Sequence, residues 1–174
     1  QESVRAQYEG YDEEVKNPGS RTETFVSVEL HSDDPRWQGV ELRLTTGKSL
    51  DGKTTEVRLY TKPTLTGDAN MLRFRIQPDE SVELTVYSKK PGYLREFELR
   101  SLDFSYPENE RLPDAYEQVL VDAMRSDKSS FASTDEIMQS WRILQPLLEA
   151  WSMETTPLLT YKKSSSIDDV LSGE

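Results

Sequence analysis

The stretch LRFRIQPDESVEL, from Leu72 to Leu84, carries the pattern that decides the fold. Successive side chains of an extended chain point to opposite faces of a sheet, so Leu72, Phe74 and Ile76 share one face and Arg73 lies on the other. A Pro-Asp pair between the two apolar runs is typical of a turn. The stretch therefore predicts two adjacent antiparallel strands, with the three apolar side chains directed into a core.

The same alternation runs from Thr22 to Phe104. It predicts about six strands, carried by TFVSVEL, VELRLTT, TEVRLYT, LRFRIQ, VELTVYS and FELRSLDF. Turn residues separate several of them, at Asp51-Gly52, Thr66-Gly67-Asp68 and Pro91-Gly92. Short links favour antiparallel neighbours, and one apolar face beside one polar face is typical of a sheet that is covered on one side.

The second half of the chain changes to helical spacing. A helix over 113–125 has Pro113 near its start, with an apolar stripe of Tyr116, Val119, Leu120 and Ala123. A second helix over 134–151 opens with Ser133 and Glu136 at capping-box spacing and contains Pro146, which predicts a kink. Its expected buried face comprises Ile137, Trp141, Leu144, Leu148 and Trp151.

Together these patterns predict an α+β fold: a largely antiparallel sheet of about six or more strands with the C-terminal helices packed on one face. We assign residues 1–154 to this sheet domain. Residues 155–174 are Ser-rich with little periodicity, and we expect them to form a surface or mobile tail.

Composition narrows the class of protein. The chain has 174 residues, of which 34% are hydrophobic and 30% charged, enough for one compact core. Its net charge of -11 opposes binding to nucleic acid or to anionic membranes. There is no cysteine, no secretion signal at the start and no apolar run of the roughly 20 residues that a membrane span needs. We expect a cytoplasmic protein, and the first residue, Gln1 instead of Met, suggests a piece of a longer one.

Residues that carry chemistry are scarce. The one histidine, His31, lies beside two acids at a strand end, where a structural role is expected. No Cys/His cluster supports a metal site, and no glycine-rich strand-to-helix turn supports a nucleotide site. The acid pairs Asp33/Asp34 and Asp168/Asp169 are interpreted as solvated, and Trp37, Trp141 and Trp151 as core or interface residues.

Two short segments remain as candidates, LTTGKSLDGKTTEVRL and RIQPDE. Lys48 and Lys53 flank an Asp-Gly turn and can offer ammonium donors to a hydroxyl or phosphate group. Gln77 ends its strand before Pro78, and its amide can bind neighbouring sugar hydroxyls. From the residues alone, exposed turn lysines and an ordinary strand-end glutamine are the favoured interpretation.

The order of several motifs adds information. The segments AQYEGY, SRTETFVSVEL, DDPRWQGVELRLTTGKSL, EVRL, LRFRIQPDE, KKPG, LPDAYEQVLVD and FASTDEIMQSWRILQPLLEAW, in this order and spacing, resemble the C-terminal domain of glucose-6-phosphate dehydrogenase over nearly the whole chain.

The resemblance implies an enzyme of the pentose phosphate pathway that oxidises glucose 6-phosphate to 6-phosphogluconolactone with NADP. The family's N-terminal Rossmann domain, which holds NADP, and its Arg-Ile-Asp-His-Tyr-Leu-Gly-Lys segment are absent from this chain. The substrate-binding residues that carry over are Lys48, from T-G-K, and Gln77, from R-I-Q-P. The resemblance assigns no catalytic, cofactor-binding or metal-binding residue here, and we expect this piece alone to be inactive and to bind no NADP.

The sequence departs from the family at several positions. Thr45 stands where many members have an arginine near a second, structural NADP, so that site is not expected here. The tail motif Tyr-x-x-Gly-Ser-x-Gly-Pro is reduced to YKKSSSIDDVL, which keeps Tyr161 and loses the glycines.

The resemblance also implies a homodimer through the sheet, in which Arg73 and Arg75 on the polar face meet carboxylates of the partner. The alternative is a solvated face with cross-strand pairs such as Arg75 beside Glu83. For function, the alternative to a piece of the enzyme is a non-catalytic interaction or assembly module that has kept the fold.

Overall fold

A computed structural model of the chain describes residues 3–64, 67–106, 115–153 and 156–173. The chain divides into two compact units, residues 1–52 with 118–174, and residues 53–117. The α+β class is confirmed, but the strands form two four-stranded sheets, whereas the sequence suggested one.

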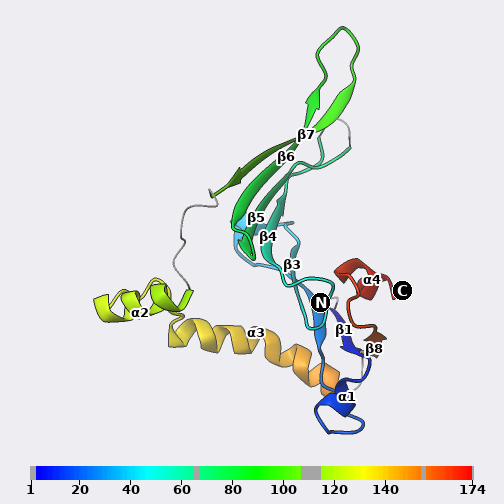
Figure 1. Ribbon diagram of the computed structural model, residues 1–174, viewed down its shortest axis with the longest axis vertical. Coiled ribbons are helices and arrows are strands. Elements are labelled where there is room, and N and C mark those ends of the chain that lie inside the picture. Colours follow the sequence, from blue (N-terminus) through cyan, green and yellow to red (C-terminus); the bar gives the residue numbers. More distant parts are fainter. Residues whose placement is uncertain (1–2, 65–66, 107–114, 154–155, 174) are drawn as a thin grey trace. The chain divides into compact units, whose positions relative to one another are not determined.

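The sheet of the first unit has the order β3-β2-β1-β8. Its strands are β1 (Ser3–Tyr8), β2 (Phe25–Leu30), β3 (Leu42–Gly47) and β8 (Leu158–Tyr161). β2 pairs antiparallel with both β1 and β3, whereas β8 runs parallel to β1 and lies beside it (Figure 1). A strand from the C-terminal part of the chain therefore borders the first strand.

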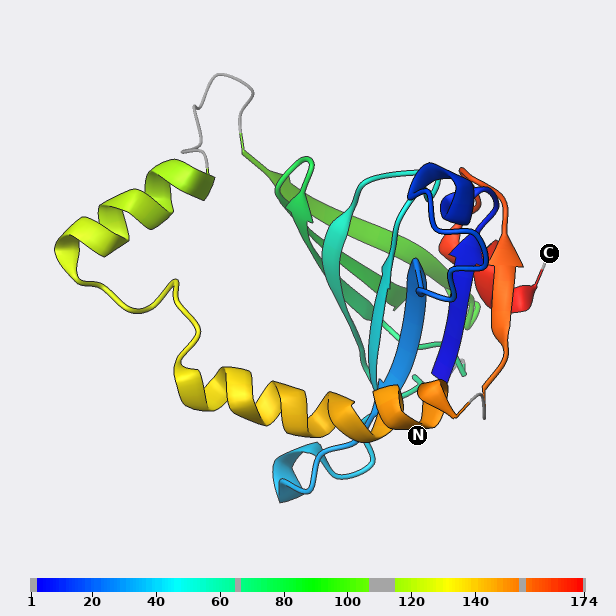
Figure 2. The same ribbon diagram turned by 90° about the horizontal axis from the view of Figure 1, so that it is seen from below.

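Helices cover both faces of this sheet. Ala6 of β1 belongs to a core cluster with Val170 of α4 (Ile167–Ser172). Its neighbour Arg5 points to the opposite face, since side chains alternate along a strand, and there it lies 5.6 Å from the ring of Trp151 in α3 (Thr134–Ser152). The C-terminal end of α3 runs beside β1 and β2 in Figure 2. The expectation of helices on one face alone is therefore wrong for this sheet.

The expectation of a surface or mobile tail over 155–174 is also wrong for its described part, residues 156–173. β8 supplies the buried Tyr161, and α4 supplies the buried Val170. The helix is capped by Ser166, whose hydroxyl accepts from the Asp169 amide while Asp169 accepts from the Ser166 amide. A four-residue strand is too short to show alternation, which is why the pattern missed it.

The predicted helices are present, but their buried faces differ from the expected ones. The capping box of Ser133 and Glu136 opens α3, and Pro146 lies within it. The helix predicted over 113–125 appears as α2 (Ala115–Arg125), and its expected start at Pro113 lies outside the described residues. Only the last turns of α3 are buried, through Leu147 and Trp151. Several residues expected to be buried are exposed instead: Tyr116, Val119, Leu120, Ala123, Ile137, Trp141 and Leu148.

The second unit is built on the antiparallel sheet β4-β5-β6-β7 (Figure 1). Its strands are β4 (Thr55–Tyr60), β5 (Met71–Gln77), β6 (Ser81–Lys89) and β7 (Phe97–Ser105). All six strands predicted from the alternation are therefore present, and β1 and β8 are additional. Of the expected turn before β5, Thr66 lies outside the described residues.

The apolar side chains of the second sheet form two rows across its four strands. The register aligns Val57, Phe74, Val82 and Phe104 in one row, and Leu59, Leu72, Leu84 and Leu102 in the next. Yet Phe74 is 38% and Leu102 65% exposed, and Ile76 is exposed too. The prediction of a buried side chain is wrong for Phe74 and Ile76, whereas Leu72 is half-buried. Alternation fixes which side chains share a face and not whether a layer covers it.

The polar face of the same sheet is organised by ion pairs. Arg73 of β5 lies opposite Glu83 of β6 and forms an ion pair with it. Arg75 lies opposite Ser81, so the suggested cross-strand pair of Arg75 and Glu83 is wrong. Next along the face, Arg58 pairs with Glu56 on its own strand. This face therefore neutralises much of its own charge.

We predict that Trp151→Ala lowers the free energy of unfolding by about 3–5 kcal/mol, because this side chain is 6% exposed and packs on Val28 and Leu147. The matched control is Trp141→Ala on the same helix, where 56% exposure predicts a cost of less than about 1 kcal/mol. Urea unfolding measures both. Equal losses for the two variants would contradict the assigned core.

Candidate functional site

Lys48 follows directly on the end of β3, at a point where the backbone is closely packed. A Cβ atom on Gly47 would lie 2.8 Å from side-chain atoms of both Leu50 and Phe25, so this position accepts only glycine without a shift. The Lys48 amide donates to the carbonyl oxygen of Thr24 at 2.8 Å. The Lys48 side chain is exposed, and within the described residues no hydrogen bond or ion pair occupies its ammonium group.

The carbonyl group of Lys48 accepts a hydrogen bond from a residue of β8. The hydroxyl of Tyr161 donates to the Lys48 carbonyl oxygen at 2.7 Å and lies 3.0 Å from Oγ1 of Thr24. Tyr161 is 3% exposed, and its ring packs edge-on against Phe25 at a centroid distance of 6.0 Å. Both polar groups of the Lys48 backbone are thus bonded inside the first unit.

The next residues are joined to the segment that follows β8. The Ser164 amide donates to the Ser49 carbonyl at 2.7 Å, and the Asp51 amide donates to the Ser165 carbonyl at 3.0 Å. Ser49 and Ser164 both adopt the left-handed backbone conformation, with φ of 51° and 69°. Such strain in residues other than glycine persists only where surrounding contacts impose it. The Lys48 turn is therefore shaped by the C-terminal segment.

One charged pair lies beside this junction. The Lys163 ammonium is 2.9 Å from Glu14 Oε2 and 4.8 Å from the centre of the Tyr8 ring. The hydrogen bond from Lys163 lowers the pKa of Glu14, and desolvation raises the pKa of Tyr8. Because the Glu14 pKa is depressed on folding, its stabilising contribution is present above the ordinary carboxyl pKa and is lost as pH falls through the lowered value.

Gln77 occupies the end of β5 in the second unit. It lies opposite Thr55 of β4, and its side chain is exposed. Lys53, near the start of the same unit, is exposed as well. Lys48 belongs to the first compact unit. The two predicted substrate-binding residues, Lys48 and Gln77, therefore belong to different units.

The remaining polar residues singled out from the sequence have local roles. His31 lies 3.3 Å from Glu29 and is largely exposed. Asp34 accepts from the Arg36 amide at the start of the 3-10 turn η1 (Pro35–Trp37), and the Arg36 guanidinium lowers the pKa of Asp34. In the described ranges, no group of three or more His, Cys, Asp or Glu residues could hold a metal ion. None of the helices described is long and apolar enough to cross a membrane.

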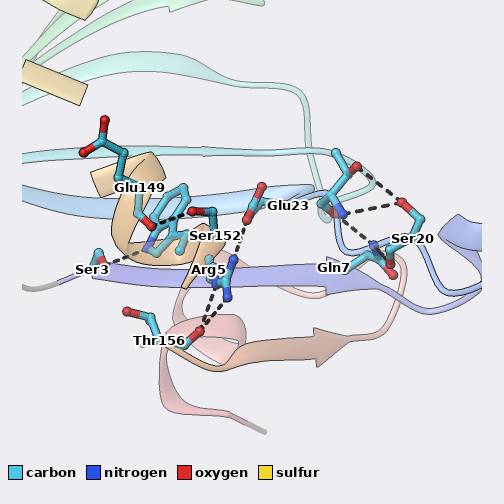
Figure 3. A network of polar contacts seen from close by, with 10 residues as sticks. Ser3, Arg5, Gln7, Ser20, Glu23, Glu149, Ser152 and Thr156 are labelled. Atoms are coloured by element: carbon cyan, nitrogen blue, oxygen red, sulfur yellow. Dashed lines mark hydrogen bonds and ion pairs between the residues drawn. The ribbon is translucent and has the colours of Figure 1, made fainter. Parts of the chain in front are cut away.

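A pocket of about 260 Å³ opens beside Arg5, Glu23 and Trp151. Figure 3 shows that the Arg5 guanidinium is already committed to protein acceptors: Nη1 donates to Glu23 at 2.8 Å, and Nε and Nη2 donate to the carbonyl of Thr156. The charge of this buried arginine is therefore compensated, and the network fixes the chain that leads into β8. We interpret this as a structural site.

Comparison with known proteins places these features in a family. The family model described as "Glucose-6-phosphate dehydrogenase, C-terminal domain" matches residues 1–169. The chain belongs to this family. It is 38% identical over 152 residues to glucose-6-phosphate 1-dehydrogenase of Mycolicibacterium smegmatis, covering 81% of this chain and 31% of that protein. It is 35% identical over 201 residues to the enzyme of the same name from Treponema pallidum, covering 99% and 39%.

Solved structures of the family agree with the fold. A glucose-6-phosphate dehydrogenase in complex with its substrate glucose-6-phosphate superposes with a TM-score of 0.83 at 27% identity, covering 98% of this chain and 40% of that one. Glucose-6-phosphate 1-dehydrogenase from Mycobacterium avium gives a TM-score of 0.75 at 30% identity, with coverage of 94% and 36%. The chain thus spans about a third of the length of its glucose-6-phosphate dehydrogenase relatives.

Reasoning from the sequence found Lys48 but missed the residues that hold it. Tyr161, Ser164 and Ser165 lie in a segment that had been assigned to a tail, more than 100 positions away. The available signal was the retained tyrosine of the glucose-6-phosphate dehydrogenase tail motif. No local pattern connects it with the T-G-K turn.

Proposed function

We propose that this chain is the C-terminal domain of an enzyme that oxidises glucose 6-phosphate to 6-phosphogluconolactone, and that it completes the sugar pocket. The observation that carries the proposal is the Lys48 ammonium, which forms no hydrogen bond or ion pair with any described residue. It lies on a turn whose backbone is bonded at both the N–H and the carbonyl group of Lys48. A point charge on a rigid support suits the recognition of a phosphate or sugar hydroxyl. Gln77, exposed at a strand end, offers an amide for the same substrate.

The reaction itself belongs to residues outside this chain. Hydride transfer needs a base for the C1 hydroxyl proton and a nicotinamide held close to C1. His31 is paired with Glu29 on the surface and is not such a base. We propose NADP as the acceptor in the complete enzyme, bound by its N-terminal domain, and no cofactor on this part alone. The cytoplasm is the proposed compartment, consistent with a chain free of cysteine.

We also propose a homodimer through the sheet β4-β5-β6-β7. Its polar face contains Arg75, whose Nε is buried without a hydrogen-bond partner in the described part of the chain. The side chain as a whole is half-buried, and a carboxylate of the partner would compensate the charge at the part of the guanidinium that stays accessible. This is the role first expected for Arg73 and Arg75, but Arg73 is already paired with Glu83.

The dimer is tested by sedimentation of the complete dehydrogenase. We predict that Arg75→Ala raises the dimer dissociation constant about tenfold or more, because a charge-assisted hydrogen bond across the interface is lost. Arg58→Ala is the matched control, since Arg58 pairs within its own strand. Equal dissociation constants for both variants and the parent would remove Arg75 from the interface.

The sugar site is tested in the dehydrogenase that contains this domain. Lys48→Ala and Gln77→Ala should each reduce kcat/KM for glucose 6-phosphate by the equivalent of roughly 1–3 kcal/mol, with little change in the KM for NADP. Lys53→Ala, another exposed lysine, is the comparison variant. Normal sugar kinetics in both variants would reduce Lys48 and Gln77 to scaffold and favour the alternative, a non-catalytic interaction or assembly module.

The chain alone serves as a control in the same assay. It should give no reduction of NADP or NAD with saturating glucose 6-phosphate, because it holds neither the base nor the nicotinamide. Turnover that tracks the concentration of purified chain would contradict the division of roles proposed above.

A further inference from the structure

We propose that the hydroxyl group of Tyr161 positions Lys48 for the substrate, so that the C-terminal strand acts on a site formed at the end of β3. This inference rests on the function proposed for Lys48. Tyr161 is a positioning residue here: its hydroxyl is buried and contacts the Lys48 backbone, whereas the Lys48 ammonium is exposed.

The Tyr161 hydroxyl has two carbonyl acceptors within reach, that of Lys48 at 2.7 Å and that of Thr24 at 3.2 Å. The Tyr8 amide donates to Oγ1 of Thr24 at 2.9 Å, and this hydroxyl lies 3.0 Å from the Tyr161 oxygen. Tyrosine has one hydroxyl hydrogen, and its shortest contact is the Lys48 carbonyl oxygen at 2.7 Å. Thr24 therefore donates to Tyr161, and Tyr161 donates to Lys48. Each bond in such a buried chain polarises the next.

The two polar backbone groups of Lys48 are bonded to two different segments of the chain. The Lys48 amide is bonded to the Thr24 carbonyl, and the Lys48 carbonyl is bonded to Tyr161. Two anchors on one residue fix the orientation of its peptide groups and hence the direction in which the Cα–Cβ bond leaves the backbone. A lysine side chain has many rotamers, so a fixed starting direction limits the volume that its ammonium samples.

The surrounding packing separates the role of the hydroxyl from that of the ring. The ring of Tyr161 contacts Phe25 and Tyr8 edge-on, at centroid distances of 6.0 and 6.2 Å. Tyr161→Phe keeps these ring contacts and removes the hydroxyl, and with it the donor to Lys48 and the bond with the Thr24 hydroxyl. The bonds from Ser164 to Ser49 and from Asp51 to Ser165 also remain. The variant therefore loosens the Lys48 carbonyl while it preserves the core.

The experiment uses the complete dehydrogenase with glucose 6-phosphate and NADP. Tyr161→Phe should raise the KM for glucose 6-phosphate about three- to tenfold, the value of one net hydrogen bond, with the KM for NADP unchanged. Tyr11→Phe is the matched control, because Tyr11 packs against the same cluster without a bond to Lys48. An unchanged KM in Tyr161→Phe, or an equal rise in Tyr11→Phe, would overturn the proposal.

A double variant separates positioning from general weakening. If Tyr161 acts through Lys48, adding Tyr161→Phe to Lys48→Ala should raise the KM no further. A second rise of the same factor would show that Tyr161 acts by another route and would overturn this inference while the proposed function stands. If Lys48→Ala itself leaves sugar kinetics normal, the proposed function fails first.

A second variant covers the case in which Tyr161→Phe does not fold. Thr24→Val removes the hydroxyl that donates to Tyr161 and keeps a side chain of similar shape. It should raise the KM for glucose 6-phosphate in the same direction by a smaller factor. A folded Thr24→Val enzyme with unchanged KM would count against the chain of bonds.

Discussion

The buried hydroxyl of Tyr161 joins segments from both ends of the first compact unit. It bonds to Thr24 before β2 and to Lys48 after β3, while its own strand β8 pairs in parallel with β1. Three segments thus meet at one oxygen atom, and β1 is joined to them by its pairing with β8. A buried tyrosine hydroxyl without a hydrogen-bond partner would lower the stability of the fold. The observed arrangement of these segments gives this hydroxyl its partners. The geometry of the Lys48 turn is a consequence of that requirement.

The two sheets differ in how far their apolar side chains are buried. The first is covered by α4 on one face and by α3 on the other, and its buried charge, Arg5, is compensated by Glu23 and the Thr156 carbonyl. The second presents two apolar rows that remain partly exposed. Contiguous apolar surface of this kind is unusual on a monomer. The chain spans about a third of the length of its glucose-6-phosphate dehydrogenase relatives.

Much of the fold follows from local pattern. Alternation identified β2 to β7, and the Ser133 capping box identified the start of α3. The same pattern could not find β8, since four residues with one parallel neighbour carry too little periodicity. It placed Trp141 in the core, because helical spacing defines a stripe without showing how far along the helix the sheet extends. Lys48 was found through its motif, whereas Tyr161 as its support depends on contacts 113 residues apart, which no local rule encodes.

The most direct test of this account is amide hydrogen exchange at Lys48 in the Tyr161→Phe chain. The Lys48 amide is bonded to the Thr24 carbonyl, and its protection depends on how firmly the turn is held. We predict that its exchange accelerates about fivefold, the effect of one lost hydrogen bond on local opening, while the amide of Leu147 in α3 keeps its rate. An unchanged rate at Lys48, or the same acceleration at both amides, would contradict the claim that Tyr161 specifically holds the Lys48 turn.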